Sequence, residues 1–274
     1  MTDDAPERLL ERLAMLLREC APAAVAVSGG VDSMTLAAVA ATVLGDEVTM
    51  FHAVSPAVPR AATARVERHA IRASWRLVKL DAGEFADQRY IDNPANRCFF
   101  CKQNLYGTLA ARTSAQLLSG TNLDDLDDWR PGLAAAAAVG VRHPFVEAHI
   151  DKAGIRVLAR YLGLDDLAEL PAAPCLSSRV ETGISIEARD LGFVDAAETL
   201  VRHVLAPRTV RCRLRREGIV IELDDEARAG LSAEKFANLH RELSDLARRH
   251  HVDGQVEIAT YRRGSAFLRG HGDP

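Results

Sequence analysis

The sequence lacks several features that would assign it to common classes. Its 274 residues contain no apolar run near the ~18 residues of a membrane span. The first four residues do not have the basic-then-apolar order of a signal peptide. Basic side chains are not in excess, with 34 against 38 acidic ones and a net charge of −4, which argues against general nucleic-acid binding. We therefore expect a soluble cytoplasmic protein whose partners are neither membranes nor nucleic acids.

Cysteine is also scarce, with five residues, an odd number that does not suit a disulfide framework. Cys98 and Cys101 form a C-x-x-C, and Cys175 stands alone after a proline. Cys20 and Cys212 occupy apolar-face positions and are expected in the core. A C-x-x-C alone is compatible with a redox pair, half a zinc site or cluster ligands. Three cysteines without a fourth ligand suit a [4Fe–4S] cluster with one open iron, and three unrelated thiols remain the alternative.

A Walker A loop is missing too, because the pattern G-x-x-x-x-G-K-[ST] does not occur. A different phosphate cradle is present, between an apolar strand over residues 23–27 and a helix over 34–44. Its glycines allow close backbone approach, and the helix N-terminus attracts anions. The cradle consists of Ser28, Gly29, Gly30, Val31, Asp32 and Ser33.

Alternating elements predict an α/β fold: a Rossmann-like parallel sheet with helices on both faces. Ala53 and Val54 end the second strand, and Thr121 follows the fourth. Ligands bind beyond the carboxyl ends of such strands, so these residues should share a crevice with the cradle. The predicted strands are 23–27, 47–54, 76–80 and 116–119, and the predicted helices are 6–20, 34–44, 61–73, 105–113 and 151–163.

A proline-bounded segment at 170–175 predicts a domain boundary, giving domains 1–170 and 171–274. The second should be a smaller α+β domain. Residues 209–214 alternate strictly, which predicts a hairpin with an apolar face and a basic face. Its further elements are helices 186–205 and 232–251 and strands 219–223 and 255–261.

Several motifs together resemble known families. Residues 28–33 resemble the pyrophosphate (PP) loop of the ATP pyrophosphatase superfamily, whose members cleave ATP between its α and β phosphates. The further motifs occur in the order of the LarE family, the ATP-dependent sulfur transferases of nickel-pincer nucleotide biosynthesis. They are Arg97-Cys98-Phe99-Phe100-Cys101-Lys102, Gly120-Thr121-Asn122-Leu123-Asp124-Asp125, Trp129-Arg130-Pro131-Gly132, Pro174-Cys175-Leu176-Ser177-Ser178-Arg179, Arg211-Cys212-Arg213 and Tyr261-Arg262-Arg263-Gly264-Ser265.

The resemblance implies MgATP-dependent adenylation of a carboxylate of pyridinium-3,5-biscarboxylic acid mononucleotide, followed by conversion to a thiocarboxylate. In some members a cysteine at the position of Cys175 is consumed as sulfur donor. In members with three cysteines placed like Cys98, Cys101 and Cys175, a [4Fe–4S] cluster carries the transferred sulfide, and this chain has all three. The resemblance also implies a homo-oligomer.

The residue types agree with this chemistry. The cradle can stabilise departing pyrophosphate, and Asp32, with Asp124 or Asp125, can hold Mg²⁺. The backbone at Ala53 and Val54 is expected to face adenine. The expected substrate contacts are Arg211 and Arg213 with the mononucleotide phosphate, Arg262 assisting, and Arg179 and Glu198.

Three other functions are compatible with the cradle. A tRNA thiolase would need a basic surface. An ammonia-using synthetase would not depend on Cys175. A nucleotide sensor would bind ATP without releasing pyrophosphate.

Overall fold

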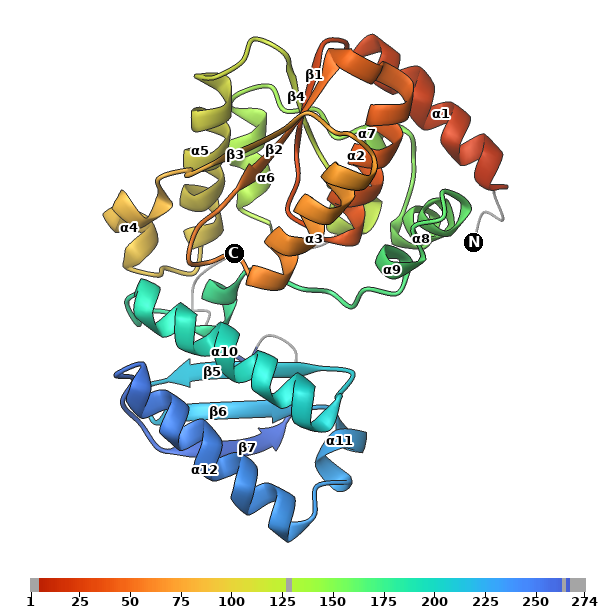
Figure 1. Cartoon of the computed structure of the whole chain (residues 1–274). Helices are drawn as coiled ribbons and strands as arrows, with labels where there is room; N and C mark the ends of the chain where they lie inside the picture. The colour runs from red at the N-terminus through yellow and green to blue at the C-terminus, as the bar shows by residue number, and fades with distance from the viewer. Residues whose placement is uncertain (1–4, 127–129, 263–264, 267–274) are drawn as a thin grey trace. The chain divides into compact units, whose positions relative to one another are not determined.

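The computed structural model describes residues 5–126, 130–262 and 265–266 (Figure 1). These residues form two compact units. Unit 1 comprises the chain up to Glu84 together with Cys98–Ala173, and unit 2 comprises Phe85–Arg97 together with the chain from Pro174. The chain therefore passes between units at 84/85, 97/98 and 173/174. Of the motif residues named above, Trp129, Arg263 and Gly264 lie outside the described residues.

Unit 1 contains the predicted parallel sheet. Its strands are β1 (Ala23–Ala26), β2 (Val48–Ala53), β3 (Leu77–Leu80) and β4 (Gln116–Ser119), in the order β3-β2-β1-β4. The helices that accompany it are α1 (Pro6–Glu19), α2 (Val31–Leu44), α3 (Arg60–Arg72), α5 (Arg97–Ala110), α6 (Gly132–Ala137), α7 (Pro144–Glu147), α8 (Lys152–Tyr161) and α9 (Asp165–Ala168), with short 3₁₀ turns η1 (Gly45–Glu47), η2 (Glu84–Ala86) and η3 (Leu123–Leu126).

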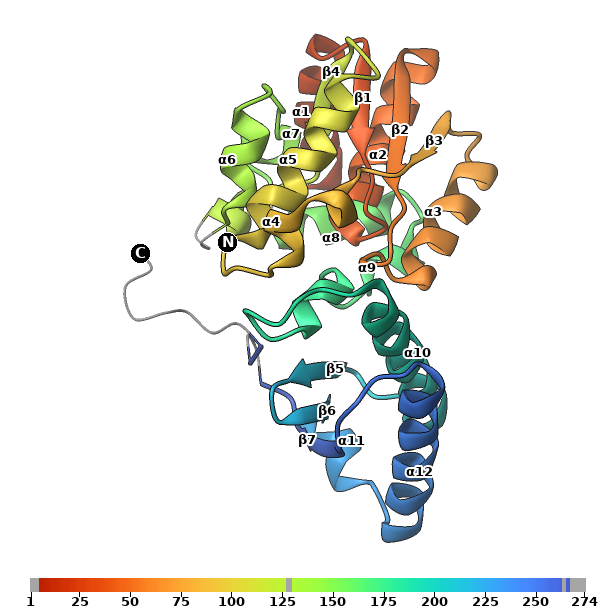
Figure 2. The same cartoon turned by 90° about the vertical axis from the view of Figure 1, so that its left-hand side faces the viewer.

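Alternating side chains of the strands build a core on each face of this sheet. In β1, Val25 packs with α1, α2 and α8, whereas Ala24 packs with α5 and α6. In β2, Met50 packs in the same core as Val25, and Phe51 packs in the same core as Ala24. Figure 2 shows α5 and α6 together on one side of the sheet. Helices on both faces confirm the predicted α/β class.

Unit 2 contains a three-stranded mixed sheet with helices α10 (Ala188–Leu205) and α12 (Ala233–Arg249) packed against it (Figure 1). The strands β5 (Val210–Arg215) and β6 (Gly218–Leu223) form the predicted antiparallel hairpin, and β7 (Val256–Thr260) pairs parallel to β6. The remaining elements are α4 (Gln88–Ile91), the 3₁₀ turn η4 (Leu176–Arg179) and α11 (Asp225–Ala229).

Two predicted helix starts were wrong. Helix α2 begins at Val31 rather than residue 34, so Asp32 and Ser33 lie in its first turn. Helix α5 begins at Arg97 rather than residue 105, so both cysteines of the C-x-x-C lie on the helix. No proline or glycine interrupts residues 97–104, and the Pro94 carbonyl accepts from the Arg97 amide to lead the chain into the helix.

Two further predictions concern composition and packing. Cys20 and Cys212 are 2% and 0% exposed, which confirms that both are core residues. Among the helices that the structure describes, none has the length and apolar character needed to span a bilayer.

Candidate active site

The loop between β1 and α2 is closed by its own serines. The Oγ atoms of Ser28 and Ser33 lie 3.0 Å apart, and the Ser28 amide donates to Ser33 Oγ at 3.0 Å. Ser33 Oγ also donates to the Gly30 carbonyl at 3.2 Å. Gly30 is the N-cap of α2, a 14-residue helix, so the positive end of its dipole faces the loop. This arrangement is suited to binding an anion such as a phosphate.

Two glycines at the loop cannot be replaced without displacing backbone. Gly29 has φ +83°, and a Cβ there would lie 2.8 Å from the Ala62 carbonyl oxygen. A Cβ on Gly120 would lie 2.7 Å from the Ser33 amide nitrogen. The segment after β4, with half-buried Thr121, therefore packs directly against the first turn of α2.

Two side chains that the sequence interpretation missed form hydrogen bonds with backbone carbonyls at the loop. His52, fully buried on β2, bonds the Val27 carbonyl through Nδ1 at 2.8 Å and Thr63 Oγ1 through Nε2 at 2.9 Å. Because a carbonyl only accepts, Nδ1 carries the proton and Nε2 accepts from threonine. Arg65 on α3 donates to the Gly29 carbonyl at 2.8 Å. Helix α3 thus fixes the loop directly, through Arg65 and the Gly29 carbonyl, and indirectly, through the bond from Thr63 to His52.

We expect unit 1 to lose stability as pH falls below about 6.5, the ordinary pKa of histidine. Burial lowers the pKa of His52 in the folded chain, so the unfolded chain binds a proton to this residue more readily. The free energy of unfolding therefore decreases as pH falls from the unfolded pKa of His52 towards its folded pKa. Melting temperatures at pH 5.5 and pH 7.5 measure the effect. His52→Gln, which does not titrate, should show a smaller pH dependence; an unchanged dependence would contradict this account.

The carboxylate of Asp32 is paired with Lys152, a third residue that the sequence interpretation missed. Lys152 Nζ lies 2.7 and 2.6 Å from the two Asp32 oxygens. Burial raises the pKa of Asp32 above its ordinary value, although the hydrogen bonds and the charge of Lys152 act to lower it. The Lys152 amide also donates to Asp124 at 3.2 Å, and Asp125 pairs with Arg130 at 2.6 Å. Two cations, Lys152 and Arg130, and three carboxylates thus lie near the start of α2, and such groups are suited to contacts with phosphate oxygens and Mg²⁺.

The residues predicted at the other strand ends have different environments. Val54, at 39% exposure, donates its amide to the Leu80 carbonyl at 2.8 Å. At the end of β4, Ser119 Oγ lies 3.0 Å from Thr121 Oγ1 and 2.7 Å from Nδ1 of His143. Burial lowers the pKa of His143, which favours its neutral form. Ala53, half-buried at the end of β2, and Thr121 lie with the loop at the carboxyl edge of the sheet.

In unit 2, Cys175 is exposed and caps the 3₁₀ turn η4. Its carbonyl accepts from the Ser178 amide at 3.0 Å, from Ser178 Oγ at 2.7 Å and from Arg179 Nη1 at 3.1 Å. Arg179 Nη1 also donates to the Pro174 carbonyl at 2.7 Å. The backbone that carries the thiol is therefore fixed, while the side chain remains accessible.

Arg179 and Glu198, predicted as substrate contacts, bind each other. Two guanidinium nitrogens of Arg179 meet the two Glu198 oxygens at 2.8 and 3.1 Å, and both residues are 1% exposed. Glu198 also accepts from Arg202 and from the Cys212 amide. Burial opposes ionisation of Glu198, but Arg179 holds its pKa below the ordinary value. In this structure the pair anchors the Cys175 turn.

The arginines of the hairpin do not form the open basic face that the alternation predicted. Arg213 is 4% exposed, pairs with Glu222 at 3.0 Å and donates to the Ser178 carbonyl at 3.0 Å. Half-buried Arg211 lies over the Tyr261 ring at 5.8 Å. Arg262 is exposed. Packing on both faces of β5 places Arg213 in the interior, so Arg211 and Arg262 are the more accessible of the predicted phosphate ligands.

The three predicted cluster cysteines are distributed over both units. Cys98 and Cys101, half-buried in the first turns of α5, are three residues apart and so share one face of the helix. Cys175 belongs to unit 2. Within the described parts of the chain, no three Cys, His, Asp or Glu residues form a group that could hold a metal ion. The cluster stays a prediction.

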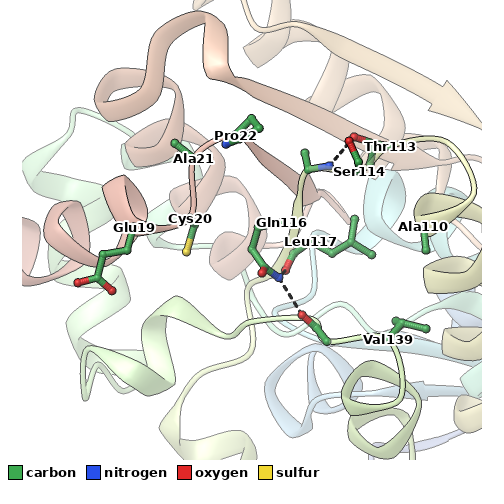
Figure 3. A pocket seen from close by; sticks show the side chains of 12 residues that line it. Glu19, Cys20, Ala21, Pro22, Ala110, Thr113, Ser114, Gln116, Leu117 and Val139 are labelled. Atoms are coloured by element: carbon green, nitrogen blue, oxygen red, sulfur yellow. Dashed lines mark hydrogen bonds between the residues drawn. The ribbon is translucent and has the colours of Figure 1, made fainter.

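A cavity of about 580 Å³ lies away from these residues, at the amino ends of β1 and β4 (Figure 3). Ligands of parallel sheets bind at the opposite edge, so this cavity does not define the candidate site. Its lining comprises Glu19, Cys20, Ala21, Pro22, Ala110, Thr113, Ser114, Ala115, Gln116, Leu117, Val139 and Gly140.

An anion-binding loop on a parallel α/β unit, joined to an α+β unit with an exposed cysteine, defines a class of two-unit α/β proteins suited to phosphorylated ligands. No family model matches the chain. It is 30% identical, over 92% of its length and 91% of the relative's, to pyridinium-3,5-bisthiocarboxylic acid mononucleotide synthase of Lactiplantibacillus plantarum. The chain belongs to the family of that synthase.

Two other relatives carry no functional name. An uncharacterized protein of Synechocystis sp. is 38% identical over 80% of this chain and 83% of its own. An uncharacterized protein of Methanocaldococcus jannaschii is 26% identical over 74% of this chain and 77% of its own.

Proposed function

We propose that this chain is an ATP-dependent sulfur transferase that converts a carboxylate of pyridinium-3,5-biscarboxylic acid mononucleotide into a thiocarboxylate. The observation that carries the proposal is the presence, in one chain, of a cradle for phosphates and an exposed thiol on a fixed turn. The name of the Lactiplantibacillus plantarum relative, a synthase of pyridinium-3,5-bisthiocarboxylic acid mononucleotide, supports the class of product.

The proposed reaction has two steps. The substrate carboxylate attacks the α-phosphorus of ATP, and pyrophosphate leaves to give a mixed anhydride with AMP. Backbone amides of the loop and Lys152 stabilise the charge on the leaving pyrophosphate. A sulfide or the Cys175 thiolate then attacks the acyl carbon, and the bond to AMP breaks. Attack by sulfide gives the thiocarboxylate directly; attack by the thiolate gives a thioester, whose cysteine Cβ–S bond must break, with loss of the Cα proton, to release the thiocarboxylate.

Two inorganic groups belong to this proposal. Asp32, with Asp124 or Asp125, would hold Mg²⁺, which neutralises phosphate charge; one or two carboxylates per Mg²⁺ are typical of nucleotide sites. Cys98, Cys101 and Cys175 would hold a [4Fe–4S] cluster as thiolates, and the two thiols on one face of α5 fit that role. Such a cluster, when bound, supplies a transferable sulfide.

The test begins with protein purified without oxygen and analysed for iron and acid-labile sulfide. We expect about four irons per chain in the parent and loss of iron in Cys98→Ala. Incubation with MgATP and the dicarboxylate mononucleotide should release pyrophosphate and AMP and exchange a carboxylate oxygen for sulfur. Pyrophosphate release without any sulfur-containing product, or an amide formed with ammonia, would contradict the proposal.

Replacing Lys152 with methionine is expected to raise the KM for MgATP by roughly 10-fold or more. A charged hydrogen bond contributes about 1.5–3 kcal/mol, and the variant leaves Asp32 without its cation beside the phosphates. Pyrophosphate release at varied ATP concentration measures this. Lys79→Met, which removes an exposed lysine paired with Glu67, is the matched control. Equal KM values in the two variants would contradict a role for Lys152 in ATP binding.

A further inference from the structure

The segment Phe85–Arg97 is part of unit 2, although unit 1 residues precede and follow it in the chain. Its central contact is Asn93, which is fully buried and adopts φ +52°. Asn93 Nδ2 donates to the carbonyls of Glu181 and Ile184, each at 2.9 Å. The Gly183 amide donates back to the Asn93 carbonyl at 3.0 Å. One asparagine thus fastens this segment to the chain that follows η4.

A second contact reaches η4 itself. The hydroxyl of Tyr90 lies 2.5 Å from Oγ of Ser177, and the two residues are 1% and 0% exposed. Ser177 is two residues from Cys175 and lies within the turn that Cys175 caps. Removing the phenolic hydroxyl would leave a buried serine without this partner, which is costly.

The third contact leads towards the other cysteines. Arg97, 1% exposed, donates through Nη1 to Asn93 Oδ1 at 2.8 Å. It is the first residue of α5, and its peptide bond joins it to Cys98. The side chain of Asn93 therefore binds both the chain after the Cys175 turn and the residue before the C-x-x-C.

We propose that Tyr90, Asn93 and Arg97 are positioning residues for sulfur transfer. They connect the Cys175 turn by hydrogen bonds to the polypeptide that enters α5. These bonds hold the Cys175 thiol in one orientation for its reaction with the mixed anhydride of substrate and AMP. Arg179 also binds this turn, through the Cys175 carbonyl. The sulfur-transfer role rests on the proposed function, whereas the restraint on the turn does not.

Tyr90→Phe tests the restraint, since it removes only one oxygen and leaves the ring contact with Phe85 in place. Hydrogen exchange of the amides of Ser178 and Val180, which donate within the turn, is measured by mass spectrometry on the full chain. Exchange should accelerate at least about tenfold, equivalent to ~1.4 kcal/mol, while exchange across β5 and β6 stays unchanged. Tyr161→Phe, on an exposed tyrosine, is the matched control. Equal exchange in the two variants would overturn the restraint.

The second measurement separates positioning from general structural support. In Tyr90→Phe, thiocarboxylate formed per pyrophosphate released should fall about tenfold, with the KM for ATP unchanged. A parallel fall of both products would overturn the positioning role. If the parent chain releases no pyrophosphate, the proposed function fails and the sulfur role fails with it, but faster exchange in Tyr90→Phe still establishes the restraint on the turn.

Discussion

Cys175→Ser is expected to reduce thiocarboxylate formation by at least about 1000-fold while substrate-dependent pyrophosphate release continues. The loop that we propose activates the carboxylate belongs to unit 1, whereas Cys175 belongs to unit 2, so the variant should leave the first step intact. Serine preserves the size of the side chain but lacks a nucleophilic or iron-binding sulfur. Parallel assays of pyrophosphate and of the product's mass measure the two steps.

The same assay on Cys98→Ser and Cys101→Ser identifies the sulfur source. Loss of product in all three variants supports a cluster held by the three thiols. Loss in Cys175→Ser alone, with a mass decrease of the parent protein by the elements of H₂S after turnover, supports consumption of Cys175. Full sulfur transfer in Cys175→Ser would contradict both sources and favour an enzyme that does not use these thiols.

Glu198→Ala is expected to lower the free energy of unfolding of unit 2 by about 3–5 kcal/mol. The change leaves the Arg179 guanidinium buried without its carboxylate, and an unpaired buried charge is strongly unfavourable. It also removes the acceptor of the Cys212 amide and of Arg202. Chemical denaturation monitored through hydrogen exchange of the α10 amides measures the loss in free energy of unfolding.

Glu169→Ala is the matched control, because Glu169 pairs with Arg160 in solvent and should contribute far less. A pH series gives an independent check. Since the folded pKa of Glu198 is lowered, its contribution is present above the unfolded value near 4.3 and is lost as pH falls through the folded pKa. Similar stabilities for the two variants would contradict a supporting role for the buried pair.

Local chemistry explains which features the sequence predicted. The strand, the glycine turn and the helix that form the cradle depend on neighbouring residues, so their order could be read directly. The continuous apolar run of β1 is likewise typical of a parallel strand covered on both faces, as the two cores show. The alternation of residues 209–214 correctly placed Cys212 in the core.

The missed residues depend on contacts between distant parts of the chain. Lys152 is 120 residues from Asp32, and Tyr90 is 87 from Ser177, so no local pattern indicates either pair. The burial of Arg213 had a signal that was overlooked. The hairpin register places Glu222 opposite Arg211 and diagonal to Arg213, which favours ion pairing across the strands.

The discontinuity of unit 2 has a consequence for folding during synthesis. Residues 85–97 leave the ribosome before their partners, and Ser177 follows Tyr90 by 87 residues. At a synthesis rate of about 5–20 residues per second, Ser177 is added roughly 4–17 seconds after Tyr90. Unit 1 therefore has time to build its sheet first, with a polar asparagine and an arginine still exposed to water. Unit 2 is then completed last, and a fragment that starts at Pro174 would lack the side chains that close it.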